Sequence, residues 1–308
     1  MLKFLKDLSV ITVSLLIILT TLVFFPPSKD NQSYISSQFD KLERLKKHSK
    51  PSIIFIGGSN LAFGLDSELL ADSLKYNIIN MGLQGSLGFA YQLETVIPHL
   101  QKDDIVILVA EYFQYLDKNC FGNGATPAKV IETTDPYFIF NLSYNNIKQI
   151  LPYLVNASFM KVLNYIQRDD PADQQRVFFN KYGDFTGHLL LPNRTPKNLK
   201  KYQLDGSINQ DVFLLIKKYK AEIEQKNASF YISYPPYPLD VAKMNRKFIS
   251  SINRHFLESG LPILNSPEAY FFRSPLFFEY ADHLNATGRK IRTIKLANDI
   301  KNGLLKIQ

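Results

Sequence analysis

Residues 51–60 read PSIIFIGGSN and contain the pattern on which the fold prediction depends. The apolar run in this stretch ends at two glycines, which permit a tight turn in front of a serine. Two further apolar runs follow at 77–81 and 105–109, and helical patterns at 66–75 and 89–100 separate the three runs. Short apolar strands alternating with helices are typical of a parallel sheet that is covered on both faces. The sequence therefore predicts an α/β fold whose ligands bind beyond the carboxyl ends of the strands.

This pattern is interrupted between about 117 and 205 and then resumes. The interrupted region is aromatic and rich in asparagine, and we interpret it as a long insertion with some helix at 147–167. A cap over the site is one interpretation of this insertion. The resumed pattern predicts helices at 211–225, at 240–258 and from 286 onward, with a strand at 229–233 and a weaker strand at 262–264.

The composition narrows the class of protein. With 308 residues, 45% of them hydrophobic, the chain can bury a sizeable core in one large domain. The formal net charge of +8 comes from 36 basic and 28 acidic residues that are spread along the chain. This charge suits an anionic surface or polymer, or simply a solvated surface. The chain has no zinc-finger spacing, RNA-binding signature or long basic run, so nucleic acid is not an expected partner.

Three other features are interpreted as structural. Cys120 is the single cysteine, which excludes an internal disulfide and any multi-cysteine metal site. Aromatic residues gather at 178–184 and 231–238, but such clusters arise by chance in a chain with 17 Tyr and 23 Phe. The second cluster is the better candidate for a ligand site, because it follows a predicted parallel strand.

The N-terminus carries the clearest topological signal. No residue from 8 to 25 is charged, and at about 1.5 Å per residue this run makes about 27 Å of helix, which nearly spans a bilayer. Lys3 and Lys6 precede it and no small-residue cleavage site follows, so we predict an uncleaved signal anchor at 1–27. Residues 28–50 are interpreted as a stalk, and 51–308 as the α/β domain. We predict that this domain lies on the extracytoplasmic side, although basic residues at 41–50 weaken that assignment.

Two side chains are candidates for catalysis. Ser59 follows the two glycines, where a tight turn presents its hydroxyl above the edge of the sheet. His283 precedes the last predicted helix, and its ordinary pKa of about 6.5 suits a general base at neutral pH. The structural alternatives are a turn with a helix-capping serine and a loop histidine that caps the following helix.

Taken together, these motifs make the chain similar to the SGNH (GDSL-like) hydrolase superfamily. The Gly-Gly-Ser sequence at 57–59 matches the family's nucleophile block, Asn-Met-Gly at 80–82 matches its second block, and His-Leu-Asn at 283–285 matches its last. The resemblance implies a flavodoxin-like three-layer sandwich with a central parallel sheet. It also implies that Ser59 is the nucleophile, that His283 is the base, and that the amides of Ser59 and Gly82 stabilise the oxyanion. It implies no metal and no organic cofactor.

The chain departs from this family at two positions. The family's third block supplies an asparagine side chain to the oxyanion hole, whereas Glu111 and Tyr112 stand here. An ionised Glu111 would oppose an oxyanion, while Tyr112 could donate a hydrogen bond to it. The family also has an aspartate three residues before the histidine, where this chain has Tyr280.

The third catalytic member is therefore open, and Glu279, Glu111 or a backbone carbonyl could take that role. Asp282 is adjacent to His283 and is expected to point elsewhere. Gly58 and Asn60, which flank the serine, are predicted to lie on the oxyanion and substrate side of the site.

The resemblance is closest to anchored members that act in polysaccharide O-acylation or teichoic-acid D-alanylation. We therefore expect an esterase or O-acyltransferase whose substrate is an acyl ester or a cell-surface polysaccharide. A membrane-embedded acyl donor protein is an expected partner. The alternative is a catalytically inactive relative that binds an envelope glycan or scaffolds a membrane acylation complex.

Overall fold

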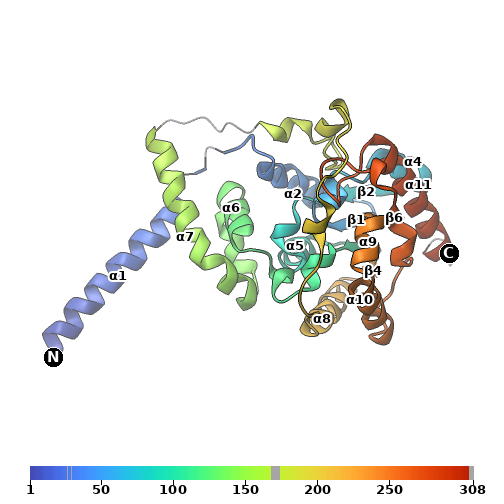
Figure 1. Ribbon diagram of the computed structural model, residues 1–308. Coiled ribbons are helices and arrows are strands. Elements are labelled where there is room, and N and C mark those ends of the chain that lie inside the picture. The colour runs from blue at the N-terminus through green and yellow to red at the C-terminus, as the bar shows by residue number, and fades with distance from the viewer. Residues whose placement is uncertain (26, 29, 168–173, 305–308) are drawn as a thin grey trace.

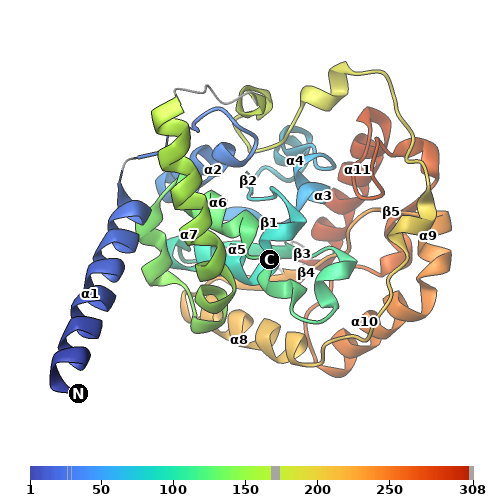
Figure 2. The same cartoon turned by 60° about the vertical axis from the view of Figure 1, so that its left-hand side comes forward.

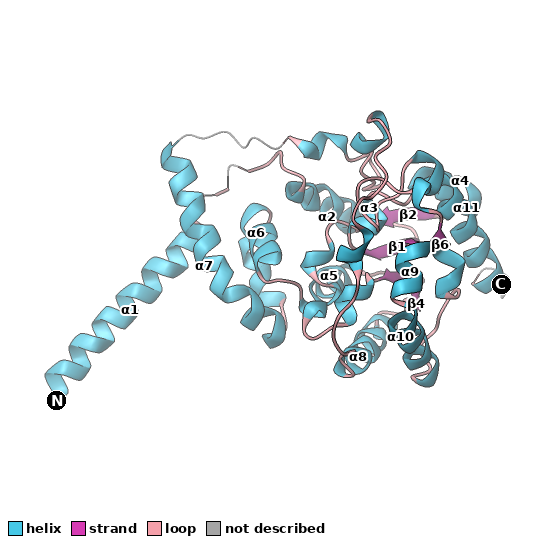
Figure 3. Cartoon of the chain, viewed as in Figure 1, coloured by secondary structure: helices cyan, strands magenta, loops and turns pink. Residues whose placement is uncertain are grey.

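The structure is a computed structural model that describes residues 1–25, 27–28, 30–167 and 174–304. A parallel sheet with the strand order β2-β1-β3-β4 forms its centre (Figure 3). The strands are β1 (Ser52–Gly57), β2 (Asn77–Asn80), β3 (Ile105–Val109) and β4 (Ser229–Ile232). Ile232 also pairs in parallel with Ile263, at the weaker predicted strand. The predicted α/β class and parallel sheet are confirmed.

Helices cover both faces of this sheet. β1 lies between β2 and β3, so the connections from β1 to β2 and from β2 to β3 cross the sheet in opposite directions. With right-handed crossovers, the helices of these two connections lie on opposite faces. Accordingly, α4 (Ser67–Leu74) packs beside α11 (Ala286–Gly303), while α5 (Phe89–Val96) and α8 (Asp211–Gln225) cover the other face (Figure 2). The helices predicted at 66–75, at 89–100, at 211–225 and from 286 onward are confirmed.

The strand register brings three strand ends to one edge of the sheet. Gly57 at the end of β1 lies opposite Val109 at the end of β3, and Phe55 lies opposite Asn80 at the end of β2. All six residues of β1 are buried, as expected for a strand with a neighbour on each side and helices on both faces. Side chains that follow β1, β2 and β3 therefore converge on a single site.

The helix predicted at 240–258 is two helices that meet at Asn245. They are α9 (Leu239–Met244) and α10 (Arg246–Glu258). The Asn245 side chain donates to the carbonyl of Val241 at 3.1 Å and to that of Tyr202 at 2.9 Å, and it accepts from the amide of Leu204 at 2.8 Å. Asparagine readily leaves the helical conformation to make such bonds, so the break ties the end of the insertion to the domain.

The insertion contributes helices and a second, smaller core. Its helices are α6 (Ala125–Thr133) and α7 (Tyr144–Gln167), and α7 confirms the helix predicted at 147–167. Leu83, Leu87 and Tyr91 of the domain pack there against Ile131 and Ile150 of the insertion. The remaining short elements of the chain are η1 (Ile35–Ser37), η2 (Gly85–Leu87), η3 (Ile97–His99), η4 (Tyr112–Tyr115), η5 (Asn119–Phe121), η6 (Pro136–Asn141), η7 (Gln175–Phe178), η8 (Gly187–Leu190), η9 (Leu199–Tyr202), β5 (Tyr237–Pro238), η10 (Pro267–Tyr270), β6 (Phe271–Phe272) and η11 (Ser274–Leu276).

The segment interpreted as a stalk packs against the domain instead. It forms α2 (Gln38–Lys47), whose Leu45 joins the main core. Lys41 is buried and donates to the carbonyls of Asn80 and Gly183. His48 is buried beside Asp104, with Nε2 2.9 Å from Oδ2. The amphipathic pattern of this segment thus serves a packed helix, and the stalk interpretation is corrected.

The N-terminal helix α1 (Leu2–Phe24) projects away from the rest of the molecule (Figure 1). None of its residues is buried, and its mean hydropathy of 2.3 makes it apolar enough to cross a membrane. Signal sequences have the same properties. Its C-terminal end contacts the insertion, where Lys161 Nζ donates to the carbonyl of Val23 at 2.9 Å and the rings of Phe24 and Tyr137 lie 4.7 Å apart.

Burial of Lys41 predicts a pH-dependent stability. Burial lowers the pKa of its ammonium from 10.5 to about 7, so between these values the unfolded chain binds the extra proton and the folded protein becomes more stable as pH rises. Lys41→Met should remove this contribution, which thermal or urea unfolding of the protein between pH 6 and 10 will measure. Lys46→Met, at an exposed position of the same helix, is the matched control. An unchanged pH dependence in Lys41→Met would contradict the assignment.

Candidate active site

Ser59 lies at the carboxyl edge of the sheet because two glycines bring the chain close to β3. It begins the short helix α3 (Ser59–Ala62) directly after Gly58. A Cβ atom on Gly57 would lie 2.5 Å from the carbonyl oxygen of Val109, and one on Gly58 would lie 2.3 Å from Oε1 of Glu111. Neither position can hold a larger residue without a shift in its neighbours. The glycines therefore set both the turn and the close approach of Glu111 to Ser59.

The structure brings Ser59 and His283 to the same carboxylate. Ser59 Oγ donates to Oδ2 of Asp282 at 3.0 Å, and Nε2 of His283 lies 4.0 Å from that oxygen. The His283 ring stacks on Phe63 with a centroid distance of 3.9 Å and an interplanar angle of 6°. Within the described part of the chain, no hydrogen bond joins Ser59 directly to His283. The Asp282 carboxylate thus accepts a hydrogen bond from Ser59 and lies near the imidazole of His283, beyond hydrogen-bond distance.

Asp282 is the residue that sequence reasoning missed. It was expected to point away from the site, because neighbouring side chains alternate in an extended segment. The chain turns at 281–282, and the amide of Phe278 donates to the carbonyl of His283 across this turn. Adjacent side chains need not alternate in a turn, so Asp282 can reach Ser59 while Nε2 of His283 lies 4.0 Å from Oδ2 of Asp282. The polar pair directly before a helix was the available signal.

Glu279 is engaged elsewhere. Its carboxylate pairs with Arg194 of the insertion at 2.8 Å, and its backbone is left-handed with φ of 58°. Tyr280, at the position of the family's aspartate, lies with its ring centroid 5.0 Å from that of His283. Of the carboxylates considered as partners of His283, Asp282 is therefore the one placed beside the ring.

Glu111 is a buried carboxyl group at the site and is held protonated. Its Oε1 accepts from the backbone amide and the side-chain amide of Asn60, each at 3.3 Å, and its carboxyl group lies near that of Asp282. Burial, and secondly the charge of Asp282, raise the pKa of Glu111 to about 8. Both effects favour the protonated form of the Glu111 carboxyl group at neutral pH.

The predicted oxyanion donors at Gly82 and Asn60 have other partners. The Gly82 amide donates to Oδ1 of Asn80 at 2.9 Å, so the expectation that it is free for an oxyanion is corrected. Asn60 is fully buried, where its Nδ2 donates to the carbonyl of Val109 at 3.1 Å and its Oδ1 accepts from Arg292 at 3.2 Å. Asn60 therefore joins α3 to β3 and α11, while its backbone amide donates to Glu111.

Tyr112 forms part of a buried aromatic wall. Its ring lies 5.0 Å from that of Tyr237 and 6.5 Å from that of Tyr234. Burial raises the pKa of its phenol, and its hydroxyl has no hydrogen-bond partner among the described residues. Tyr112 thus belongs to this wall, whereas the carboxyl group of Glu111 lies beside Gly58 and accepts from Asn60.

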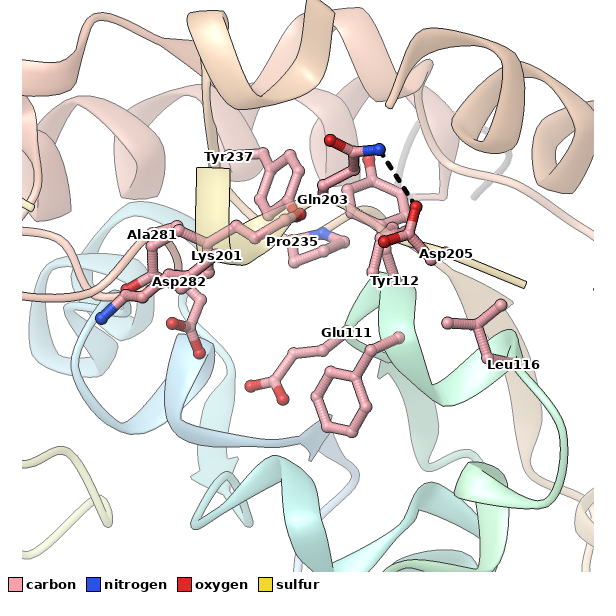
Figure 4. Close-up of a pocket in the computed structure, with 13 residues that line it drawn as sticks. Glu111, Tyr112, Leu116, Lys201, Gln203, Asp205, Pro235, Tyr237, Ala281 and Asp282 are labelled. Atoms are coloured by element: carbon pink, nitrogen blue, oxygen red, sulfur yellow. Dashed lines mark hydrogen bonds between the residues drawn. The ribbon is translucent and has the colours of Figure 1, made fainter. Parts of the chain in front are cut away.

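A cavity of about 470 Å³ opens beside this cluster. The carboxyl groups of Glu111 and Asp282 both point into it (Figure 4). Its other walls come from the end of the insertion at 201–205 and from the loop after β4. The residues that line it are Glu111, Tyr112, Phe113, Leu116, Lys201, Tyr202, Gln203, Leu204, Asp205, Pro235, Tyr237, Ala281 and Asp282. The aromatic segment at 231–238, interpreted as structural, thus contributes Pro235 and Tyr237 to the cavity.

In the described part of the chain, no three His, Cys, Asp or Glu side chains gather in a way that could hold a metal ion. Comparison of the chain with family models and with curated proteins gives no match. The geometry of the site therefore carries the functional argument.

The protonation of Glu111 can be measured directly. Infrared spectra of the protein at pH 7 should contain a protonated-carboxyl band that Glu111→Gln removes and that titrates near pH 8. Asp282→Asn removes the neighbouring charge, so it should move this titration to lower pH. Glu279→Gln, at an exposed carboxylate outside the cluster, should leave the band unchanged. Absence of the band from the folded wild-type protein at pH 7 would show that Glu111 is ionised.

Proposed function

We propose that this protein is an SGNH-type serine esterase or O-acyltransferase with a flavodoxin-like sandwich fold, acting on acyl groups of a cell-envelope polysaccharide or similar polymer. The observation that supports it most is the convergence of Ser59 Oγ and His283 Nε2 on one oxygen of Asp282, 3.0 and 4.0 Å away. A nucleophile, a base and a carboxylate within such distances are the set that acyl transfer needs. They lie beside a cavity that can admit a substrate.

In the proposed reaction, Ser59 leaves Asp282 and transfers its proton to His283 as Oγ attacks the acyl carbonyl. Burial lowers the pKa of His283, so the ring is neutral and can accept this proton. Collapse of the tetrahedral intermediate breaks the ester bond, and His283 returns the proton to the leaving alcohol. Water or a sugar hydroxyl then attacks the acyl-Ser59 ester with the proton transfers reversed. Asp282 stabilises the imidazolium that forms in each half-reaction.

Glu111 takes the place of the missing asparagine as a neutral acid. A protonated carboxyl group can donate a hydrogen bond to a developing oxyanion, and the Ser59 amide is the second donor. Glu111 is adjacent to Gly58 and hydrogen-bonded to Asn60, so its carboxyl group is at the nucleophile. A neutral Glu111 would not repel the negative charge of the oxyanion, as an ionised glutamate would.

A second candidate function is glycan binding or scaffolding without catalysis. The observations that favour it are the missing Ser59–His283 hydrogen bond and the use of the Gly82 amide by Asn80. Under either function, we propose that α1 is a single-pass anchor with the domain on the extracytoplasmic side. Its exposure and hydropathy support this role. A membrane-embedded acyl donor protein is the proposed partner of the acyltransferase.

Covalent labelling tests the nucleophile. The detergent-solubilised protein treated with a fluorophosphonate should gain one adduct by intact mass. Ser59→Ala and His283→Ala should lose it, and both should lower ester hydrolysis on the order of 10⁴-fold. Ser86→Ala, which changes a serine bonded to Thr126, should retain it. A folded wild-type protein without an adduct, or an adduct that persists in Ser59→Ala, would favour the binding function.

The neutral-acid role of Glu111 predicts a falling rate at alkaline pH. Hydrolysis of an aryl acetate should decline as pH rises through about 8, because Glu111 then ionises. The charge of ionised Glu111 interacts with three other titratable groups, which are Asp282, Tyr34 and Tyr237. Burial raises the pKa of both tyrosines well above 8. Glu111→Gln donates at every pH, so it should keep activity at pH 7 and lose the alkaline decline. An unchanged decline in Glu111→Gln would exclude this role.

A further inference from the structure

The cavity beside Ser59 combines parts of the chain that are far apart in sequence. Glu111 and Phe113 follow β3, Tyr237 follows β4, Asp282 precedes α11, and 201–205 ends the insertion. The Tyr237 hydroxyl donates to the carbonyl of Tyr202 at 3.3 Å, so the insertion wall is attached to the β4 loop. Its volume of about 470 Å³ is in the usual range for small-molecule sites. The cavity is therefore a built pocket that continues from the proposed catalytic cluster.

Its polar groups can both donate and accept. Asp282 and Asp205 offer carboxylate oxygens, protonated Glu111 offers a donor, and Gln203 offers an amide whose Nε2 donates to Asp205 at 3.0 Å. Lys201 offers an ammonium group, which lies 4.9 Å from the ring of Tyr202 and has no carboxylate partner among the described residues. Hydroxyl groups match such a mixed set, since each hydroxyl is both donor and acceptor.

The charges of the pocket disfavour an anionic ligand. Two aspartates and one lysine line it, so the basic residues behind the chain's net charge of +8 are concentrated elsewhere. Asp282, at the catalytic end, would repel an anion in a partly desolvated site. A cationic ligand would meet the positive charge of Lys201, and Asp282 already accepts a hydrogen bond from Ser59.

Rings supply the apolar part of the pocket. Phe113, Tyr202 and Tyr237 line it together with Pro235, and Phe113 and Tyr202 are partly exposed. Aromatic faces pack against the C–H faces of sugar rings while hydroxyl groups at the ring edge reach polar side chains. This combination fits a pyranose better than it fits a fatty acyl chain, which would cover the polar atoms of three carboxyl groups with apolar surface and offer them no hydrogen bonds.

We propose that this pocket binds an uncharged sugar unit, whose hydroxyl group is the acyl acceptor or the acylated position of the substrate. The role of the sugar in acyl transfer rests on the proposed function. The proposal narrows the polymer of that function to a neutral glycan. It also reverses the simplest interpretation of the basic composition, in which an anionic polymer is the ligand.

The test uses full-length Ser59→Ala protein in detergent, which cannot turn a substrate over. Its binding is measured on an array of neutral oligosaccharides of glucose, galactose, mannose and N-acetylglucosamine, with uronic-acid (anionic) and deacetylated (cationic) analogues. The neutral forms should bind at least tenfold more tightly than both charged forms. Preference for either charged form, or binding to no member of the array by a folded protein, would overturn the proposal.

Two variants locate the ligand in the pocket. Tyr202→Ala should weaken neutral-sugar binding at least tenfold, whereas Tyr137→Ala, at an exposed tyrosine beside α1, should not. Asp205→Lys, at an exposed position where folding is not at risk, should shift preference toward the uronic-acid analogues. Unchanged binding in Tyr202→Ala and Asp205→Lys would place the sugar elsewhere. Fluorophosphonate labelling of the wild type reports on the nucleophile alone, so failure of sugar binding and failure of acyl transfer are distinguishable.

Discussion

The carboxylate of Asp184 is the interaction on which the rest of the structure depends. It is fully buried and accepts from the amide and hydroxyl of Ser67 at 2.8 and 2.5 Å, from Asn80 at 2.8 Å, and from Arg289 at 2.9 Å. A buried charge of this kind is tolerable only when its hydrogen bonds are made. Because these donors belong to α4, the end of β2 and α11, a residue of the insertion ties two helices that pack side by side to the carboxyl end of β2.

The bonds of Asp184 also affect the candidate active site, through Asn80. With its Nδ2 held by Asp184 and by the carbonyl of Leu61, the asparagine aims its Oδ1 at the Gly82 amide. The amide that the resemblance assigns to the oxyanion is thereby used to shape the turn after β2. The insertion therefore contributes to the site in two ways. It orients Asn80 for the hydrogen bond with the Gly82 amide, and it supplies one wall of the cavity.

The features that could be predicted from the sequence are those that depend on local patterns of residues. Three apolar runs and their intervening helices specify the parallel sheet, and the Gly-Gly-Ser turn places Ser59 at its edge. What it could not predict depends on contacts between distant residues. The orientation of Asp282 follows from a turn, the helix break at Asn245 follows from bonds to Tyr202 and Leu204, and the burial of Lys41 follows from its bonds to Asn80 and Gly183. None of these has a periodic signal in the chain.

The raised pKa of Glu111 explains how a site with two neighbouring carboxyl groups, Glu111 and Asp282, could carry out acyl transfer. In the proposed reaction, attack by Ser59 creates a negative oxygen near Asp282, and a second ionised carboxylate at Glu111 would raise the energy of that state further. Burial of Glu111 makes its ionisation costly, and the charge of Asp282 makes it costlier still, so the pKa of Glu111 is raised to about 8. The same charge on Asp282 favours the protonated form of His283 that accompanies the oxyanion. An asparagine at position 111 would donate a hydrogen bond to the oxyanion at any pH. Glu111 can donate only while it is protonated, so in the proposed reaction its role as a donor depends on pH and on the charge of Asp282.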